Sequence, residues 1–388
     1  MHSANYLIQK VFITFGLVLI LVSCSIIFMG LLGIISLDLF SIGFSSGIRI
    51  LASFAITGCL AGAIGSNLGG LLTQGGQDVT LLARGAQFAA LKDQGLVIER
   101  EGIPDQHHRV KVISPAESSG QFDLIFVCLK AMQLEDSAAD MVSRLTPDGA
   151  LVMIQNGLPW WYFEGVSSQF SGVSIQCLDQ KGMLKKYLPI ERIVGAVIYM
   201  PIVQIAPGRI FWSNAVAPKL VIGEVNHEIT PRVRAIESLM SQVGLATVVT
   251  DNIRSFKWQK LLVNMVWNSL CAITQSSPGY IAANAYNAQL VEQLIQEGLA
   301  VAKSVGVEVD VSASKELDRV KNIFNQQPSM LQDVRAGKEM ECDAIVNCVI
   351  EIAQITGIQV PALRFISGLL DVINQAIIRE KKGIQFCN

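Results

Sequence analysis

The apolar residues in the middle of the chain fall into short runs, separated by polar turns and by longer stretches of helical character. Short, nearly continuous apolar runs are typical of strands buried on both faces, as in a parallel sheet covered by helices. We therefore expect an α/β unit with strands at residues 50–57, 78–83, 122–129 and 150–154, and a helix at residues 63–74.

The pattern changes near residue 250. Before that point, apolar runs at residues 193–199, 208–212 and 220–223 are expected to extend the sheet in antiparallel fashion at one edge. Beyond residue 251 the apolar residues recur with a helical period. This predicts helices at residues 252–275, 286–305, 313–325, 339–356 and 361–379. We expect an α/β domain over residues 49–250 and a helical domain over residues 251–388.

The beginning of the chain contains a long uncharged segment. Residues 11–37 form a stretch of 27 residues without a charged side chain. About 20 such residues can span a bilayer as a helix, and the apolar part of a secretory signal is shorter, about 7–15 residues. Two interpretations stay open for residues 1–48: a membrane anchor, or a spurious extension in front of an ordinary enzyme. Membrane contact is expected only under the first.

Composition narrows the classes of partner and site. The net charge of −2 and the isoelectric point near 6.1 offer no basic surface, so no nucleic acid partner is expected. The eight cysteines include no C-x-x-C pair and lie mostly in apolar runs, which predicts a reducing, cytoplasmic compartment. The four histidines are scattered, so no metal site is expected.

The clearest motif is a turn between the first predicted strand and the first helix. Dinucleotide-binding α/β domains carry G-x-G-x-x-G here, because glycine lets the backbone approach the pyrophosphate and lets the helix pack closely on the strand. Gly62 and Gly65 occupy the second and third glycine positions, but Leu60 occupies the first. A phosphate site formed by Gly62, Ala63, Ile64 and Gly65 at the helix N-terminus is still expected.

The residue after the second predicted strand indicates which dinucleotide binds. NAD enzymes place an acidic residue near this point to accept a hydrogen bond from the ribose 2′-hydroxyl. This chain has Arg84, which suits a 2′-phosphate and predicts NADP(H) as the cofactor. Lys130 and Asn156 follow two further strands at the same sheet edge, where such sheets bind ligands, so Lys130 is expected to hold a phosphate or a substrate charge. The alternatives are a surface lysine at a strand end and an asparagine that serves only the turn. The predicted fold class is an α/β Rossmann-type NADP-binding domain followed by an all-helical C-terminal domain.

A polar stripe marks the helix predicted at residues 252–275. Lys260, Asn264 and Asn268 are spaced four residues apart, so they share one face of an otherwise apolar helix. Such a stripe is costly to bury unless it lines a wet or liganded cleft, although a narrow solvated face is the simpler alternative.

A second polar group follows. Ser329 and Asp333 are four residues apart, and Glu341 begins a mostly apolar stretch. These side chains are expected to hold the lysine of the stripe or to accept substrate hydroxyls; solvated charges at helix starts are the alternative.

Taken together, these blocks resemble the ketopantoate reductases (2-dehydropantoate 2-reductases) over residues 55–380. The resemblance rests on the spacing between A-G-A-I-G-S-N-L-G, D-V-T-L-L-A-R-G, K-A at residues 130–131, Q-N-G at residues 155–157, K-L-L-V-N-M-V-W-N, and S-M-L-Q-D through E-C-D-A-I-V-N. It implies that NADPH reduces the C2 carbonyl of 2-dehydropantoate, which gives (R)-pantoate for pantothenate and coenzyme A synthesis.

The resemblance also implies roles for single residues. Lys260 is the general acid, and Glu341 acts beside it and contacts the cofactor ribose or a substrate hydroxyl. The implied substrate-binding residues are Lys260, Asn264, Asn268, Ser329 and Asp333, the last supporting Lys260 or the closed state. The implied cofactor-binding residues are Gly62, Ala63, Ile64, Gly65, Arg84, Lys130, Asn156 and Glu341. Helical domains of this type often pair, so a homodimer is a further expectation.

Three departures from the family pattern keep alternatives open. Leu60 breaks the glycine motif, and Ser276, Ser277 and Pro278 stand where some members carry a third substrate-contacting asparagine. Residues 166–192 also form a longer segment than is usual in the family. Two alternative functions therefore stay open: a reductase of another 2-oxo acid on the same scaffold, or a membrane-anchored dinucleotide-binding protein with impaired catalysis.

Overall fold

The computed structural model describes residues 55–60 (backbone only), 62–117, 120–165, 169–213 and 217–384. The chain divides into two units, Met1–Phe54 and Ala55–Asn388, and all of the described residues belong to the second. The extension predicted over residues 1–48, its uncharged segment 11–37 and the side chain of Leu60 lie outside the described residues.

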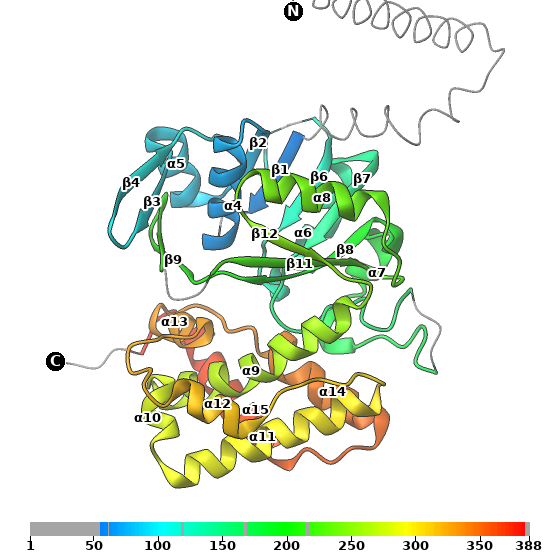
Figure 1. The fold of residues 1–388 in the computed structure, drawn as a ribbon, viewed down its shortest axis with the longest axis vertical. Helices are drawn as coiled ribbons and strands as arrows, with labels where there is room; N and C mark the ends of the chain where they lie inside the picture. The colour runs from blue at the N-terminus through cyan, green and yellow to red at the C-terminus, as the bar shows by residue number, and fades with distance from the viewer. Residues whose placement is uncertain (1–54, 61, 118–119, 166–168, 214–216, 385–388) are drawn as a thin grey trace, which may run out of the picture. The chain divides into compact units, whose positions relative to one another are not determined.

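The α/β unit is built on a large sheet of order β12-β11-β8-β7-β6-β1-β2-β5 (Figure 1). All neighbouring strands in it pair in parallel, except that β11 runs antiparallel to β8. The order reverses at β1, which lies between β2 and β6, and such a switch point is where open α/β sheets bind ligands. The strands are β1 (Ala55–Leu60), β2 (Asp78–Leu82), β5 (Lys111–Ile113), β6 (Phe122–Val127), β7 (Leu145–Met153), β8 (Ile193–Tyr199), β11 (Lys219–Glu224) and β12 (Ala246–Val249).

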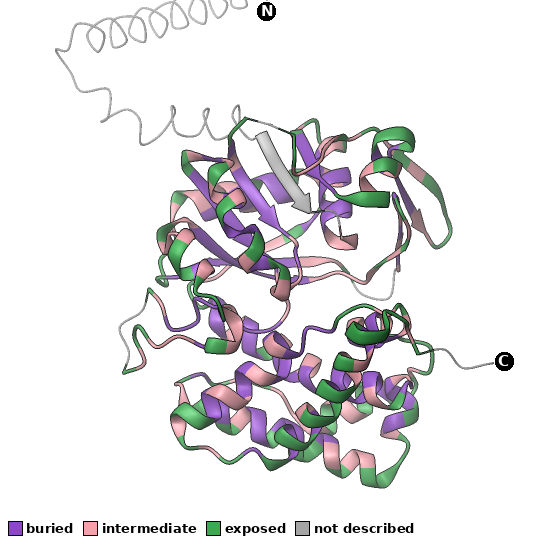
Figure 2. Cartoon of the chain, turned by 180° about the vertical axis from the view of Figure 1, so that it is seen from behind, coloured by how far each residue is buried: buried purple, intermediate pink, exposed green. Residues whose placement is uncertain are grey.

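Helices cover this sheet because its strands are apolar on both faces. Figure 2 shows buried residues concentrated along the strands and on the inner sides of the helices. Helix α4 (Ala63–Gln74) approaches β2 closely, since a Cβ added at Gly69 would lie 2.4 Å from Leu81 Cδ2. The other helices here are α5 (Gly85–Gln94), η2 (Ala131–Gln133), α6 (Leu134–Ser143), η3 (Gln176–Leu178), α7 (Met183–Tyr187), η4 (Ile190–Arg192) and α8 (Pro231–Gln242).

A second sheet, of order β4-β3-β10-β9, corrects part of the sequence prediction. Residues 208–212 were expected to extend the main sheet, but β10 (Arg209–Trp212) pairs with β3 (Leu96–Arg100) and β9 (Ile202–Ala206). The fourth strand is β4 (Ile103–His108). The run at residues 193–199 was expected to be antiparallel, but β8 is parallel to β7. Apolar runs locate strands, but only long-range pairing decides which sheet and direction they take.

The rest of the described chain is helical and has its own apolar core. Helix α9 (Ile253–Thr274) is central to that core, and Asn252 begins the helix by accepting a hydrogen bond from the Ser255 N–H. Around α9 lie α10 (Pro278–Ala282), α11 (Ala285–Ser304), α12 (Ala313–Val320), α13 (Ser329–Arg335), the π-helical segment η5 (Asp343–Asn347), α14 (Cys348–Thr356) and α15 (Pro361–Glu380). The single helix expected at residues 339–356 is thus η5 followed by α14.

By length and apolar composition, α15 is the one helix in the described part of the chain that is able to cross a membrane. Of its most apolar window, 28% is buried inside the fold.

Candidate active site

The start of α9 is held by a buried arginine. Arg254 donates from its Nε to the Tyr162 carbonyl at 2.8 Å and from its two terminal nitrogens to the carbonyls of Val225 (2.6 Å) and Glu164 (2.7 Å). Burial lowers the pKa of Arg254 to about 10. Because three carbonyls from two separate loops share one guanidinium, the first turn of α9 is fixed against the α/β unit. No feature of the sequence had singled out Arg254.

The Q-N-G turn after β7 meets both α9 and η5. Gln155 donates from Nε2 to the Val127 carbonyl at 2.7 Å, which ties the turn to β6. Gly157 has φ +80°, and a Cβ added there would lie 1.9 Å from the Ala344 carbonyl oxygen. That oxygen accepts a hydrogen bond from the Leu158 N–H at 3.0 Å. Only glycine fits this position, because the turn lies directly on η5.

Lys260 projects from α9 to the carboxyl ends of two strands. Its Nζ donates to Asn156 Oδ1 at 3.0 Å and to the Ile198 carbonyl at 2.6 Å, and it lies 5.6 Å from the ring centroid of Tyr199. Burial lowers the pKa of Lys260 to about 8, against the opposing effect of Glu341. The lysine predicted as the general acid therefore has a pKa close to physiological pH, which suits proton transfer.

A second lysine, which was not among the predicted site residues, lies one turn earlier on α9. Lys257 is 3% exposed, and its Nζ donates to the Gln155 carbonyl at 2.8 Å. Burial, together with the charge of Lys260, lowers the pKa of Lys257 to about 7. The signal was available, because residues three apart on a helix share a face, so K-W-Q-K places both lysines together.

Glu341 completes a short chain of hydrogen bonds from Lys260. Its Oε1 accepts from the Ala131 N–H at 3.2 Å, and its carboxyl group also hydrogen-bonds Asn156, which in turn accepts from Lys260. Burial raises the pKa of Glu341, and the nearby Lys130 opposes that rise. Residues from both parts of the described chain thus meet around Asn156.

Lys130 and Asp333 form an ion pair beside this chain. Lys130 Nζ lies 2.7 Å from Asp333 Oδ1 and donates to the Glu339 carbonyl at 2.9 Å. Burial raises the pKa of Asp333, and Lys130 counteracts the rise. From the resemblance, Asp333 was expected to support Lys260 or the closed state, and Lys130 was expected near the cofactor. In this structure the two side chains contact each other.

The remaining predicted substrate residues lie further along α9. Asn268 is buried, and its Oδ1 accepts hydrogen bonds from the Ser329 hydroxyl at 3.0 Å and from the Met330 N–H at 3.1 Å. Asn268 and Ser329 are therefore partners at the start of α13. Asn264 is half-buried within α9, and its side-chain amide makes no hydrogen bond to another described residue. Its amide is thus the one in the stripe that a ligand reaches without displacing a protein contact.

The predicted dinucleotide-binding turn lies at the N-terminus of α4. Gly62 is the N-cap of α4, the first turn contains no acidic residue, and no side chain caps it. A Cβ added at Gly62 would come no closer than 3.8 Å to any described atom, so the chain itself does not demand glycine there. Gly65 is buried in the same turn, while Ala63 and Ile64 are half-buried. These N–H groups suit a pyrophosphate.

Arg84 is the N-cap of α5 and is exposed. It makes no ion pair with another described residue, so its guanidinium is available to a phosphate. Leu60 is the last residue of β1, and the pairing of β1 with β2 changes register between Thr57 and Leu60.

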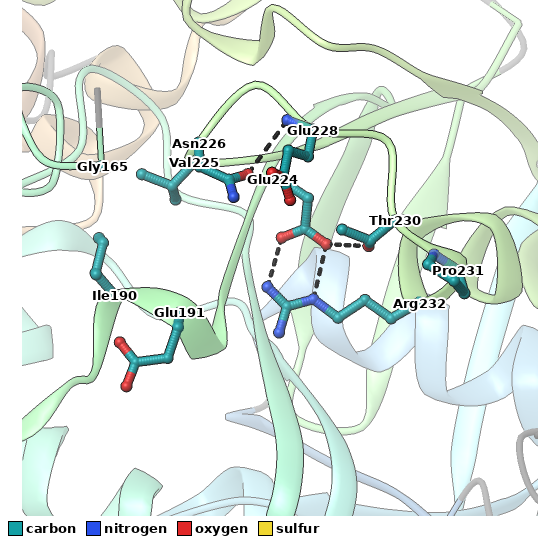
Figure 3. Close-up of a pocket in the computed structure, with 10 residues that line it drawn as sticks. All are labelled: Gly165, Ile190, Glu191, Glu224, Val225, Asn226, Glu228, Thr230, Pro231 and Arg232. Atoms are coloured by element: carbon teal, nitrogen blue, oxygen red, sulfur yellow. Dashed lines mark hydrogen bonds and ion pairs between the residues drawn. The ribbon is translucent and has the colours of Figure 1, made fainter. Parts of the chain in front are cut away.

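A cavity of about 510 Å³ lies elsewhere, and none of the predicted site residues lines it. Figure 3 shows its main polar contact, in which Arg232 binds both carboxylate oxygens of Glu224, at 2.7 and 2.5 Å. Glu224 is paired with Val194 at the start of β8, whereas Lys260 lies against the end of that strand. The buried carboxylate is fully paired, which indicates a structural role.

Comparison with known proteins decides the family. Residues 54–227 match the model described as Ketopantoate reductase PanE/ApbA, and residues 252–374 match the model described as Ketopantoate reductase PanE/ApbA C terminal. A 2-dehydropantoate 2-reductase from Mesorhizobium japonicum is 30% identical over 311 residues, which cover 80% of this chain and 94% of that protein. The chain belongs to the ketopantoate reductase family. It is therefore a member of a family of dinucleotide-binding oxidoreductases.

Solved structures agree with this ketopantoate reductase fold. A Ralstonia solanacearum protein assigned to the ketopantoate reductases is 27% identical, has a TM-score of 0.78, and is matched over 84% of this chain and 99% of its own. A D-mandelate dehydrogenase, solved with NADH and anilino(oxo)acetate, has a TM-score of 0.71 at 21% identity, with 83% and 99% covered. The predicted fold class, a Rossmann-type domain followed by a helical domain, is confirmed.

Lys257 offers a test of the electrostatics inside this site. Its folded pKa, about 7, is below its ordinary value, so between pH 7 and about 10.5 the unfolded state holds more protons than the folded one. The free energy of unfolding should therefore rise with pH in this window. We expect Lys257→Met to reduce that slope by up to about 1.4 kcal/mol per pH unit, measured by denaturant unfolding at several pH values.

Lys321→Met, at an exposed lysine, is the control for this measurement and should keep the wild-type slope. An unchanged slope in Lys257→Met would mean that the Lys257 ammonium is not desolvated in solution.

Proposed function

We propose that this protein reduces 2-dehydropantoate to (R)-pantoate with NADPH, and that Lys260 is the general acid. The observation that carries the proposal is the position of Lys260. Its desolvated ammonium lies at the carboxyl ends of β7 and β8 and binds Asn156, which in turn hydrogen-bonds Glu341. Ligands of open parallel sheets bind at this edge.

A bound NADPH, held by the turn at Gly62 and Gly65 and by Arg84, would supply the hydride for the C2 carbonyl carbon in the proposed reaction. Lys260 stabilises the negative charge that develops on the carbonyl oxygen and then protonates that oxygen. Asn156 and the Ile198 carbonyl orient the lysine, since both accept hydrogen bonds from its Nζ. Glu341 orients Asn156 and, in the resemblance, contacts the cofactor ribose or the substrate hydroxyl.

Asn264, Asn268 and Ser329 are proposed to bind the substrate hydroxyl and carboxylate. Asn264 is ready to do so, whereas Asn268 and Ser329 bind each other and would have to exchange that contact or use their remaining hydrogen-bonding groups. Lys130 is likewise proposed to approach the cofactor, and Asp333 to support closure. Their ion pair joins the N-cap of η2, just after β6, to α13, so it is positioned to hold the two domains, residues 49–250 and 251–388, together.

The proposed reaction is tested with the full chain by following NADPH consumption. The substrate panel is 2-dehydropantoate, 2-oxo-3-methylbutanoate, pyruvate and phenylglyoxylate. The highest kcat/KM is expected for 2-dehydropantoate. Faster turnover of another member would favour the alternative, a reductase of a different 2-oxo acid. NADPH binding without turnover of any of them would favour impaired catalysis, and no NADPH binding would exclude the proposal.

Arg84 is proposed to read the 2′-phosphate of NADPH. We expect Arg84→Ala to weaken NADPH binding by about 10–100-fold, because charge-assisted hydrogen bonds contribute about 1.5–3 kcal/mol. NADH binding should change by less than about threefold. Both dissociation constants can be measured by isothermal titration calorimetry. Equal losses for the two cofactors would show that Arg84 does not contact the phosphate.

Further expectations accompany the proposal. The protein is proposed to form a homodimer and to bind a small 2-oxo acid rather than nucleic acid. The cytoplasmic location stays a prediction, and membrane contact through residues 11–37 is expected only if the N-terminal extension is a genuine part of the protein. If the Leu60 side chain crowds the pyrophosphate turn, as the motif predicts, Leu60→Gly should strengthen NADPH binding.

A further inference from the structure

Helix α9 buries a second positively charged side chain that the proposed reaction does not use. Lys257 is 3% exposed, and the one hydrogen bond that its ammonium makes to a described residue joins Nζ to the Gln155 carbonyl oxygen at 2.8 Å. Removing an ammonium from water without a carboxylate partner is unfavourable, and an apolar side chain at the same position would avoid that cost. The burial of Lys257 is therefore best explained by what its ammonium holds.

The Gln155 carbonyl is one of three points at which the Q-N-G turn is anchored. The Gln155 side chain donates to the Val127 carbonyl of β6, and Gly157 lies directly on η5. Lys257 supplies the third anchor, from α9. Because these contacts come from three different elements and lie on both sides of Asn156, they fix the backbone from which the Asn156 side chain projects.

Asn156 is the residue that this turn presents to the site. Its Oδ1 accepts a hydrogen bond from Lys260 Nζ at 3.0 Å, and its side chain also hydrogen-bonds Glu341. A carboxamide has to be turned correctly to serve both partners, because its oxygen only accepts and its nitrogen only donates. Control of the backbone at residue 155 thus reaches Lys260 through one intervening side chain.

The two lysines share one face of α9, but they are not equivalent. Lys260 is half-buried, whereas Lys257 is buried and bound to the turn. A substrate therefore has access to the first ammonium and not to the second. The charged groups that face Lys257 are Lys260 on the same helix and Glu341 just before η5. Lys257 thus acts on the site through other protein groups.

We propose that Lys257 is a positioning residue. By holding the Gln155 carbonyl it orients Asn156, and through Asn156 it orients the Lys260 ammonium. The inference rests on the proposed function, because it assigns Lys257 to the same reaction. It goes beyond that function by naming the buried contact that aligns the acid.

Replacing Lys257 by methionine removes the donor and keeps an unbranched side chain of similar length. In the full chain we expect kcat for 2-oxo acid reduction to fall by about 10-fold, because a hydrogen bond from a charged group is lost. KM should stay within about threefold of wild type, since the substrate contacts are kept. The melting temperature should not fall, because a buried ammonium is removed. A merely structural lysine would behave in the opposite way, with lower stability and unchanged kcat.

A double-mutant cycle with Asn156→Ala tests the route. If Lys257 acts through Asn156, the double variant should have the kcat of Asn156→Ala alone, to within about twofold. The matched control is Lys321→Met, the same chemical change at an exposed lysine, which should leave kcat unchanged with either residue at position 156. Losses that add for Lys257→Met and Asn156→Ala would overturn the route through Asn156.

Lys257→Arg is the rescue variant, because arginine also donates to a carbonyl oxygen. Its kcat below pH 7 should lie within about threefold of wild type, since the contact with the turn is kept. The pKa of Lys257 is about 7, so wild type loses this charge above pH 7, whereas arginine keeps its own and disfavours the charge on Lys260. The fall of kcat with rising pH should therefore begin at a lower pH than in wild type. A folded Lys257→Arg protein with the low kcat of Lys257→Met would contradict the proposal.

An NMR comparison makes the test independent of turnover. The side-chain amide signals of Asn156, observed in the isotope-labelled full chain without substrate or cofactor, should move in Lys257→Met and stay in place in Lys321→Met. Unchanged Asn156 signals in Lys257→Met would overturn the proposal, whatever substrate the enzyme reduces. Moved signals in a protein that turns over no 2-oxo acid would contradict the proposed reaction and still support the positioning contact.

Discussion

Replacing Lys260 by alanine is expected to lower kcat for 2-oxo acid reduction by about 10²–10⁴-fold, the usual contribution of a general acid. The side chain is the only described ammonium that binds both Asn156 and the Ile198 carbonyl, so no neighbouring group takes its place at the same point. Steady-state kinetics with the best substrate of the panel, together with NADPH titration, provides the measurement. NADPH affinity should change little.

The pH profile identifies what Lys260 does. Because its pKa is lowered to about 8, its protonated form, the acid, is lost as the pH rises through 8. For wild-type protein, kcat for reduction should therefore fall above pH 8. Lys260→Arg is the informative control, since arginine keeps the positive charge but does not release its proton near neutrality. Its kcat should stay low while its KM remains within a few-fold of wild type.

If Lys260→Ala keeps more than a third of the wild-type kcat, another group protonates the product. Lys257 is then the next candidate, because it is the second desolvated lysine on the same helix face.

The second large effect is expected at Gly157. Gly157→Ala should lower the free energy of unfolding by about 2–4 kcal/mol, because it combines a left-handed backbone with a clash against a carbonyl. The added Cβ would lie 1.9 Å from the Ala344 oxygen, so the turn or η5 must move. Movement of the turn also displaces Asn156, and kcat should fall with stability. Denaturant unfolding and steady-state kinetics measure the two effects.

Gly306→Ala is a matched control for the backbone conformation. Gly306 has φ +79°, almost the same as Gly157, but a Cβ added there meets nothing within 4 Å. It should cost only about 1–2 kcal/mol, the usual penalty of the left-handed conformation for an L-residue, and should leave kcat unchanged. Equal effects at Gly157 and Gly306 would show that the contact between the turn and η5 is not tight in solution.

Several features of this protein follow from local pattern. The buried strands and α4 were predictable, because apolar runs and helical periodicity depend on near neighbours in the chain. The same holds for the placement of Lys260, Asn264 and Asn268 on one face of α9, since a helix fixes the direction of residues four apart. Arg84 could likewise be singled out from the sequence, because it is a charged residue that follows the predicted strand at residues 78–83.

Other features depend on contacts between distant residues, which no local pattern encodes. The apolar run at residues 208–212 was predicted as a strand. Its pairing with β3, more than a hundred residues earlier, could not be predicted from the sequence. Arg254 has no distinguishing feature in the sequence, because the three carbonyls that it binds come from loops distant in the chain. The ion pair of Lys130 with Asp333 likewise joins residues about two hundred positions apart, and the sequence does not indicate which acidic residue a given lysine contacts.

The amino-acid order therefore specifies which elements form and which side chains share a face, because these depend on backbone geometry over a few residues. The arrangement of the candidate active site depends instead on the tertiary structure. Lys260 acquires its lowered pKa only when α9, the Q-N-G turn and the end of β8 exclude water from its ammonium, and Lys257 acquires its own in the same way. Desolvation is a property of the packed fold, since water is removed only when segments from both domains come together.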